Sequence, residues 1–409
     1  MNRLRKIIMF FITYLTRKPF LWLFSQALLY VPILFSLYLM VRINQVTEEF
    51  NSKIITGFEE TAEHRFWKPN DSYNLRNYIE PFKDTALIMP SGLCKQKSLL
   101  TIFVASRVDG FQTRKVIRET WGNTSRFNYP EFNKMHGHLK GLYYPLLESR
   151  LVLYAEHLRR KNYSLFAMVE IVFIVGRSTS PNPDFILRQL QQEADHYNDI
   201  IQEDFLDTYY NLTLKSVLAL KHVNNKCFNS SAYFLKTDDD CFVNVPNLIH
   251  ILLGGTIPAY KSHRKKQDRL TATRGVLMGH AFNKNKPIRY CCTKFYVPKY
   301  IYPGSMFPKY LSGSGYLMSI DVVRRLYEAA WSTRMIHIED LFVTGLCSLA
   351  AEVNPVKSPL FILNNSHKTC FIKGSVVQHD VGISRIKNVF NRFTNNKTIC
   401  PIKSSVPIV

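Results

Sequence analysis

The hydrophobic and polar positions divide the 409-residue chain into stretches of different character. Residues 20–41 form an apolar run of 22 positions without a charge, residues 42–97 are polar and irregular, and apolar runs recur from residue 98 onward. Because about 20 helical residues cross the hydrocarbon core of a bilayer, we interpret 20–41 as a transmembrane helix. A buried core helix is the alternative interpretation.

From residue 98 onward the apolar pattern predicts strands and helices in alternation. Short runs that contain β-branched residues predict buried strands at 99–105, 171–175 and 232–237. Segments with helical character are expected at 111–120, 183–196 and 212–223. This alternation indicates an α/β fold, in which helices cover the faces of a sheet. Ligands of such sheets bind at the carboxyl ends of the strands.

Basic residues predict the orientation of the apolar run in the membrane. Five Lys and Arg residues precede the run, whereas only Arg42 and Lys53 follow it closely. The positive-inside rule therefore places the N-terminus in the cytosol. The predicted layout is a cytosolic tail at 1–19, a transmembrane signal anchor at 20–41, a lumenal stem at 42–97 and a lumenal catalytic domain at 98–409.

The formal net charge of +22 favours an anionic partner, such as a nucleic acid, a membrane surface or an acidic substrate. Nucleic acid is excluded by the predicted topology, because the basic body would lie in the lumen. All eight cysteines follow the apolar run, where disulfides can form, but their pairing cannot be read from the sequence. Seven Asn-x-Ser/Thr sequons also agree with a secretory location.

Three adjacent carboxylates, Asp238, Asp239 and Asp240, directly follow the predicted strand 232–237. Such neighbours repel one another unless a cation or solvent relieves them. Mg²⁺ and Mn²⁺ take oxygen ligands and bridge carboxylates to phosphates, and a metal can neutralise the charge that grows on a departing nucleotide diphosphate. The triplet therefore predicts a metal site, with an exposed acidic turn as the alternative.

A second acidic pair, Glu339 and Asp340, lies between apolar residues. A partly buried setting raises the pKa of a carboxylate and suits a general base, whereas an acidic pair at a helix N-terminus is the alternative. Gly313 and Gly315 lie between the two acidic clusters. We expect these glycines to let the backbone approach a ligand closely, although a bare turn would also explain them.

Further motifs accompany the two acidic clusters. In chain order the series comprises 114–122, 173–176, 199–215, 236–244, 294–297, 310–316 and 339–345. This series resembles the β-1,3-galactosyltransferase family, which includes β-1,3-N-acetylglucosaminyltransferases, and it covers about residues 98–355. The resemblance implies a GT-A type nucleotide-sugar-binding sheet flanked by helices, preceded by one N-terminal transmembrane helix.

The resemblance also implies roles for the acidic residues. Asp238 to Asp240 correspond to the DxD-type motif, with Asp240 and Asp238 as metal ligands. Asp238 and Asp239 would also face the nucleotide sugar, with Gly313 and Gly315 near the same ligand. Asp340, paired with Glu339, would be the catalytic base of an inverting displacement.

Other assignments by resemblance leave an alternative open. Arg114, Arg118 and Trp121 would lie by the donor nucleotide, unless the tryptophan belongs to the core and the arginines to the surface. His379 is a further candidate metal ligand, and a surface histidine is its alternative. The chain departs from the family pattern at Phe295, where a tryptophan is usual. The stretch 123–170 is also longer than usual, and its role is unexplained.

Together these features predict an inverting glycosyltransferase, a single-pass type II protein of the Golgi membrane. It would use Mn²⁺, or another divalent cation, to move galactose or an N-acetylhexosamine from a UDP-sugar to a glycan hydroxyl, forming a β-1,3 linkage. The acceptor would be a glycoprotein, glycolipid or proteoglycan. The rival is a catalytically silent glycan-binding or chaperone relative, against which both acidic clusters argue.

Overall fold

The computed structural model describes residues 36–42, 72–262, 268–290, 293–363, 369–395 and 397–402. Two compact units divide the chain, Met1–Thr61 and Ala62–Val409. In the first unit, residues 36–42 are helical. The predicted tail, most of the predicted transmembrane segment and most of the predicted stem lie outside the described residues. Within the described residues, no helix is both long and apolar enough to span a bilayer.

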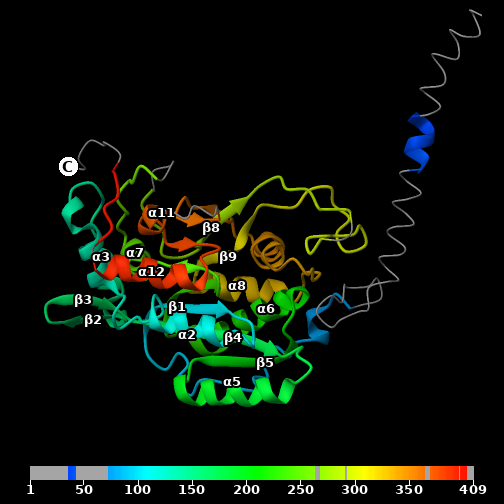
Figure 1. Ribbon diagram of the computed structural model, residues 1–409, viewed down its shortest axis with the longest axis horizontal. Helices are drawn as coiled ribbons and strands as arrows, with labels where there is room; N and C mark the ends of the chain where they lie inside the picture. Colours follow the sequence, from blue (N-terminus) through cyan, green and yellow to red (C-terminus); the bar gives the residue numbers. More distant parts are fainter. Residues whose placement is uncertain are drawn as a thin grey trace, which may run out of the picture. The chain divides into compact units, whose positions relative to one another are not determined.

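A seven-stranded sheet forms the centre of the second unit (Figure 1), in the order β10-β8-β9-β6-β1-β4-β5. The strands are β1 Ser98–Ala105, β4 Val169–Arg177, β5 Ile200–Leu206, β6 Ser231–Asp238, β8 Leu277–Phe282, β9 Tyr310–Ser319 and β10 Val356–Lys357. Strands β6, β1, β4 and β5 are mutually parallel, and β9 runs antiparallel to both of its neighbours. The three predicted strands are confirmed as β1, β4 and β6.

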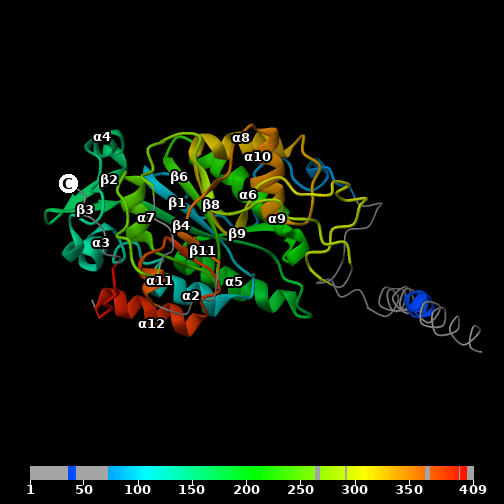
Figure 2. The same cartoon turned by 90° about the horizontal axis from the view of Figure 1, so that it is seen from above.

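Helices cover both faces of this sheet, as predicted for an α/β fold. The three predicted helices are confirmed as α2 Phe111–Glu119, α5 Pro183–Tyr197 and α6 Leu212–His222. Figure 2 shows α2, α5 and α12 (Ile383–Thr394) on one side of the strands, with α6 and α8 (Ile320–Ala330) on the other. Parallel strands covered on both faces are apolar throughout, and every residue of β1 is buried.

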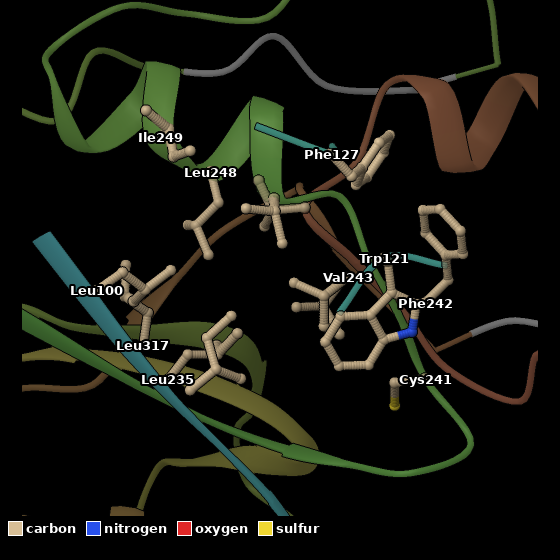
Figure 3. Close-up of a cluster of buried hydrophobic side chains, with 14 of the residues drawn as sticks. Leu100, Trp121, Phe127, Leu235, Cys241, Phe242, Val243, Leu248, Ile249 and Leu317 are labelled. Atoms are coloured by element: carbon tan, nitrogen blue, oxygen red, sulfur yellow. The ribbon is translucent and has the colours of Figure 1, made fainter. Parts of the chain in front are cut away.

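Two hydrophobic cores fill the space between the sheet and its two helical layers. Successive residues of β1 point to opposite faces, so Ile102 and Val104 join one core and Phe103 joins the other. In the first core, Trp121 lies near Phe242 and Val243 (Figure 3) and is fully buried. This tryptophan packs the segment that follows α2 against strand β7 (Phe242–Val243).

The segment 123–170, whose role the sequence left unexplained, builds a layer beside α7 (Val245–Leu252). It contains α3 Tyr129–His136, α4 Glu148–Leu153 and the hairpin of β2 Leu158–Lys161 with β3 Ser164–Ala167. Phe132 of α3 stacks on His250 of α7 with ring centroids 3.7 Å apart. The long insertion is therefore part of the hydrophobic core.

A small sheet in the order β11-β12-β7 joins the C-terminal region to the chain just after the acidic triplet. Its strands are β11 Phe361–Ile362, β12 Val377–Gln378 and β7 Phe242–Val243. Gln378 pairs with Phe242 in antiparallel register. This pairing brings His379 to the residues that precede β7.

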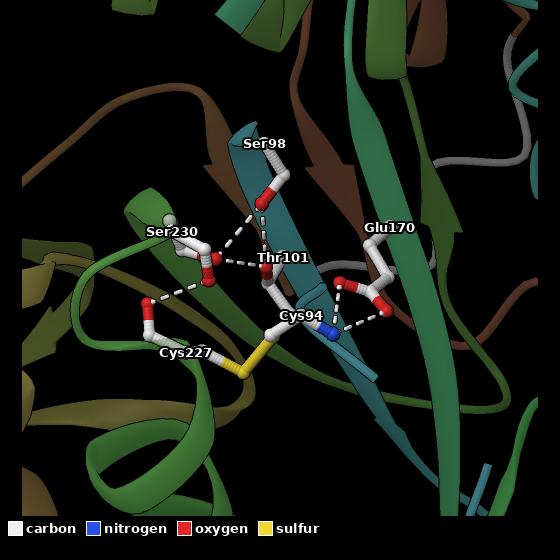
Figure 4. The surroundings of a disulfide bond; sticks show 7 residues. Cys94, Ser98, Thr101, Glu170, Cys227 and Ser230 are labelled. Atoms are coloured by element: carbon white, nitrogen blue, oxygen red, sulfur yellow. Dashed lines mark hydrogen bonds between the residues drawn. A yellow bond between two sulfur atoms is a disulfide. The ribbon is translucent and has the colours of Figure 1, made fainter. Parts of the chain in front are cut away.

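The packed body begins before the predicted boundary at residue 98. Leu75 and Ile79 are buried in the second core. Cys94 forms a disulfide with Cys227, and its backbone N–H donates to Glu170 (Figure 4). These contacts place the segment from Leu75 onward, assigned to the stem from its composition, on the body. A second disulfide joins Cys370 to Cys400.

The remaining described elements complete the chain. Short helical segments lie at Leu75–Asn77, Gly137–Leu139, Ala155–His157, Tyr209–Asn211, Val223–Cys227, Glu339–Leu341 (α9), Phe342–Cys347, Ser348–Ala350 (α10) and Thr369–Lys373 (α11). The segment 310–316 belongs to strand β9, so its interpretation as a bare turn is wrong. Its glycines lie inside a strand because neighbouring side chains need the space, as described below.

Candidate active site

The acidic triplet lies at the edge of the sheet where ligands of α/β proteins bind. Strands β1, β4, β5 and β6 are parallel, so their carboxyl ends share one edge. Strand β6 ends at Asp238, beside Ala105 at the end of β1. The predicted position of the triplet at the end of a buried strand is therefore confirmed.

Each carboxylate of the triplet has a different partner. Asp238 accepts a hydrogen bond from Lys236 Nζ at 2.7 Å, and Asp239 accepts one from Ser106 Oγ at 2.7 Å. Asp240 Oδ2 lies 3.4 Å from His379 Nε2. Asp239 is thus tied to the end of β1, while the carboxylates on either side of it face other neighbours.

Asp238, Asp240 and His379 are the residues that could hold a divalent cation. Their side chains are 34%, 51% and 35% exposed, so an ion can reach them. Carboxylate oxygen and imidazole nitrogen both suit Mn²⁺, and such ions commonly complete their shell with water and substrate phosphate. Across the described residues, no three acidic, histidine or cysteine side chains converge into a ready-made metal cage. A cation bound by these side chains would need further ligands, such as water or a substrate phosphate.

A buried lysine, Lys236, links the triplet to the second acidic pair. Its Nζ donates to Asp238 and to the carbonyl of Gly313, each at 2.7 Å, and lies 3.5 Å from Glu339 Oε2. Burial disfavours its charge, but the carboxylates of Asp238 and Glu339 outweigh burial and raise the pKa of Lys236. This lysine was missed as a site residue. The signal was present, because residues two apart on a strand face the same side.

The two carboxylates of the second pair differ in their surroundings. Glu339 is buried and accepts a hydrogen bond from the Tyr316 hydroxyl at 2.7 Å. Asp340 is half-buried and accepts from the backbone N–H groups of Leu341 at 2.8 Å and Gly313 at 3.1 Å. The pair also lies at the start of the short helix α9. The sequence offered a buried setting and a helix N-terminus as alternatives, and the structure shows both.

Burial is the main reason that the pKa of Asp340 is raised, to about 7, and the charge of Glu339 adds to the effect. The N–H groups of Gly313 and Leu341 oppose this shift without cancelling it. A carboxylate with a pKa near neutrality is a better proton acceptor than an ordinary aspartate. Asp340 therefore has the basicity that a general base needs.

The glycines of β9 make room for side chains of the protein itself. A Cβ added at Gly313 would lie 2.8 Å from Glu339 Oε2, and one added at Gly315 would lie 3.0 Å from Val377 Cγ1. Gly313 therefore allows the acidic pair to approach β9 closely. Its N–H and carbonyl in turn bind Asp340 and Lys236.

Both arginines assigned to the donor form ion pairs. Arg114 is fully buried, so its interpretation as a surface residue is wrong, whereas Arg118 is half-buried. Arg114 pairs with Glu193 at 2.7 Å, and Arg118 pairs with Glu193 at 2.6 Å and Asp199 at 2.7 Å. Arg114 also donates to Ser106 Oγ at 3.2 Å. Because Ser106 in turn donates to Asp239, the middle carboxylate of the triplet, Arg114 holds the residue that positions this carboxylate.

Comparison with known proteins identifies the family of this protein. The family model described as galactosyltransferase matches residues 154–359, half of the chain. Beta-1,3-galactosyltransferase 1 of Homo sapiens and of Mus musculus is 28% identical over 322 residues, which cover 78% of this chain and 81% of the relative. Beta-1,3-galactosyltransferase 2 of Mus musculus is 29% identical over 370 residues, 87% of this chain and 72% of the relative. The matched region contains both acidic clusters, Lys236 and Gly313, and the protein belongs to the galactosyltransferase family.

Proposed function

We propose that the protein is an inverting, metal-dependent β-1,3-galactosyltransferase of GT-A type that transfers galactose from UDP-galactose to a glycan hydroxyl. Family membership and the names of the relatives support the transferred sugar and the linkage. One observation carries the proposal. Asp340 is half-buried, its pKa is raised to about 7, and its neighbour Glu339 is linked through Lys236 to Asp238 of the acidic triplet at the ligand-binding edge.

The two clusters divide the work of the reaction. An acceptor hydroxyl is a poor nucleophile at neutral pH, so Asp340 takes its proton as the oxygen attacks the anomeric carbon. A divalent cation held by Asp238, Asp240 and His379 would supply positive charge to the departing diphosphate. Because the leaving group then needs no proton, a single carboxylate base is sufficient, whereas a glycosidase needs two carboxylates.

Glu339 has a supporting role in this scheme. Its two oxygens face the Tyr316 hydroxyl and the Lys236 ammonium, so both already have hydrogen-bond partners in the protein. Its negative charge contributes to the raised pKa of Asp340. Glu339 therefore positions and tunes the base beside it. A silent glycan-binding relative would need neither the tuned base nor the acidic triplet.

The test is a UDP-release assay of the full-length protein in detergent, with Mn²⁺ and a panel of glycan acceptors. UDP-galactose should give acceptor-dependent release, UDP-GlcNAc and UDP-GalNAc much less, and EDTA should abolish it. NMR of the product should show a β-1,3 linkage. If no donor releases UDP, whether or not an acceptor is present, the proposal is refuted and the silent relative is favoured.

Two variants test the metal site in the same assay. Asp240→Ala should remove Mn²⁺-stimulated turnover, because it deletes the most exposed carboxylate of the triplet. Asp184→Ala, an exposed carboxylate at the start of α5, is the matched control and should retain activity. Full activity of either the wild type or Asp240→Ala in EDTA would contradict metal dependence.

We also propose that residues 20–41 anchor the protein in the Golgi membrane as a type II protein, with the catalytic domain in the lumen. The charge-free apolar run and the basic residues before it support this orientation. Protease treatment of sealed microsomes should remove only a short N-terminal piece. Digestion of the whole body would reverse the proposed topology.

A further inference from the structure

Two aromatic rings from distant parts of the chain meet beside the acidic pair. Tyr209 lies in the short turn between β5 and α6, and Phe295 lies in the connection between β8 and β9. Their ring centroids are 6.2 Å apart, and the rings are nearly perpendicular. The Lys294 ammonium lies 4.8 Å from the Tyr209 centroid and 5.2 Å from the Phe295 centroid. We call these three residues the aromatic platform.

The aromatic platform is open to solvent. Phe295 is 48% exposed, Lys294 is exposed and Tyr209 is half-buried. In the described part of the chain, neither ring belongs to the two hydrophobic cores or packs against them. Core packing therefore does not explain why an exposed phenylalanine is held against a tyrosine and a lysine.

Neighbouring contacts fix the platform close to the base. The ring of Tyr210 lies 5.6 Å from His337, and Thr213 Oγ1 donates to the carbonyl of Ile336 at 2.7 Å. These contacts dock the start of α6 against the residues that lead into Glu339. Burial raises the pKa of the Tyr209 hydroxyl, and the nearby carboxylates of Asp340, Glu339 and Asp238 add to this effect.

The chemistry of the platform matches a sugar ring. One face of a hexopyranose presents C–H groups that pack on an aromatic ring, while its hydroxyls need polar partners such as an ammonium or a phenol. In the proposed function, the acidic triplet serves the leaving group and Asp340 serves the nucleophile. The platform lies by the residue that deprotonates the nucleophile, so the sugar it fits is the acceptor.

We propose that the aromatic platform of Tyr209, Lys294 and Phe295 is the subsite for the acceptor hexopyranose, with Phe295 packing on its apolar face. The inference rests on the proposed function, since it takes Asp340 as the base. It adds what the family match leaves open, namely which residues select and hold the acceptor. Lys294 and the Tyr209 hydroxyl supply hydrogen bonds to the ring hydroxyls.

The experiment uses full-length protein with UDP-galactose, Mn²⁺ and two probes, the methyl β-glycosides of N-acetylglucosamine and galactose. Phe295→Ala should raise the KM for the better acceptor at least tenfold. The KM for UDP-galactose should change much less than the KM for the acceptor. Phe295→Trp keeps an aromatic face and should retain most of the acceptor affinity. Tyr163→Ala, another exposed aromatic at the tip of the β2–β3 hairpin, is the matched control.

Saturation-transfer NMR with the same two glycosides separates this inference from the proposed function, because it needs no turnover. Loss of the signal in Phe295→Ala, with the signal kept in Phe295→Trp and Tyr163→Ala, supports the platform even if no donor is used. An unchanged signal and KM in Phe295→Ala would overturn it. A rise in donor KM alone, or no binding of either glycoside to the wild type, would overturn it as well.

Discussion

At the scale of single residues, adjacent carboxylates acquire different chemistry from their partners. Glu339 faces a phenol and an ammonium, whereas Asp340 accepts bonds from two backbone N–H groups. Burial raises the pKa of Asp340 to about 7, and the charge of Glu339 adds to this effect. Two acidic residues next to each other in sequence can therefore hold separate roles in one reaction.

The first prediction concerns Asp340 as the base. Asp340→Asn keeps the size of the side chain but removes the proton acceptor, so kcat should fall by roughly 10²–10⁴ with little change in donor KM. In the wild type, turnover should decline as pH falls through about 7, because Asp340 becomes protonated. Glu339→Gln should shift this decline to lower pH, since it removes the neighbouring negative charge. If Asp340→Asn keeps near-normal turnover while Glu339→Gln loses it, Glu339 is the base and Asp340 has the supporting role.

The same shift predicts a pH-dependent cost to stability. The pKa of Asp340 is about 7 in the folded state and near 4 in an unfolded chain, so above pH 7 folding must bury a charge. At pH 8, Asp340→Asn should therefore unfold at a higher temperature than the wild type. Its free energy of unfolding should be greater by about 1–3 kcal/mol. The difference should shrink as pH falls and disappear below about pH 4. Thermal melts of metal-free protein measure this, and a constant difference from pH 8 to pH 4 would contradict it.

Gly313 gives a steric prediction at the same scale. An added Cβ would lie 2.8 Å from Glu339 Oε2 and 3.4 Å from Asp340 Cβ, so Gly313→Ala must displace the acidic pair. We expect kcat to fall at least tenfold and stability to fall by about 1–3 kcal/mol. Gly137→Ala is the control, because its Cβ would meet open space at a helical φ of −57°. Equal activity of the two variants in the transfer assay would argue against a steric role.

At the scale of elements, helices α2 and α5 are joined by ion pairs that are largely shielded from solvent. Arg114 is fully buried, and Glu193 accepts from both Arg114 and Arg118. Removing one partner of a buried pair leaves a charge without compensation. The contact between these helices supports the active site as well, because Arg114 also donates to Ser106.

Arg114→Met should therefore destabilise the protein by about 3–5 kcal/mol, measured by chemical denaturation. Lys115→Met is the control on the same helix, since Lys115 is exposed, and it should change stability by less than about 0.5 kcal/mol. The double variant Arg114→Met with Glu193→Leu should recover part of the loss, because the buried carboxylate that has lost one of its two arginines is gone and Arg118 keeps Asp199. A double variant less stable than Arg114→Met would show that packing, and not charge, dominates.

At the scale of the whole molecule, two disulfides close loops of very different length. Cys94–Cys227 spans a sequence separation of 133, and Cys370–Cys400 spans 30. The entropy of loop closure in the unfolded chain predicts stabilisation of about 5 and about 4 kcal/mol, respectively. The longer disulfide also fixes the segment before β1 to Val223–Cys227, the helical segment that follows α6 in the same hydrophobic core.

Replacing both cysteines of the longer loop with serine should lower stability by about 2–5 kcal/mol. The same replacement at Cys370 and Cys400 should cost less, because its loop is shorter. Non-reducing peptide mapping confirms the remaining bond in each variant, and thermal unfolding compares them. A greater loss from the shorter loop would mean that native contacts of the C-terminal region outweigh loop entropy.

The sequence by itself determined the features that depend on neighbours along the chain. The strands β1, β4 and β6 and the helices α2, α5 and α6 were predictable, because apolar periodicity reports local burial. The acidic triplet and the acidic pair were visible as motifs, and the position of the triplet at the edge of the sheet followed from the end of a predicted strand. The family resemblance rested on the order of such motifs, which requires no coordinates.

Only the tertiary structure decided which side chains meet. Ser106 reaches Asp239 across 133 residues, Lys236 reaches Gly313 across 77, and the β7–β12 pairing places His379 by the triplet. The burial of the arginines and the aromatic platform also depend on partners that are remote in sequence. Hydrophobic periodicity reports how deeply a segment is buried and carries no information about the register of segments that are distant in the chain. Long-range pairing of strands and helices therefore brings these motifs together at the candidate active site.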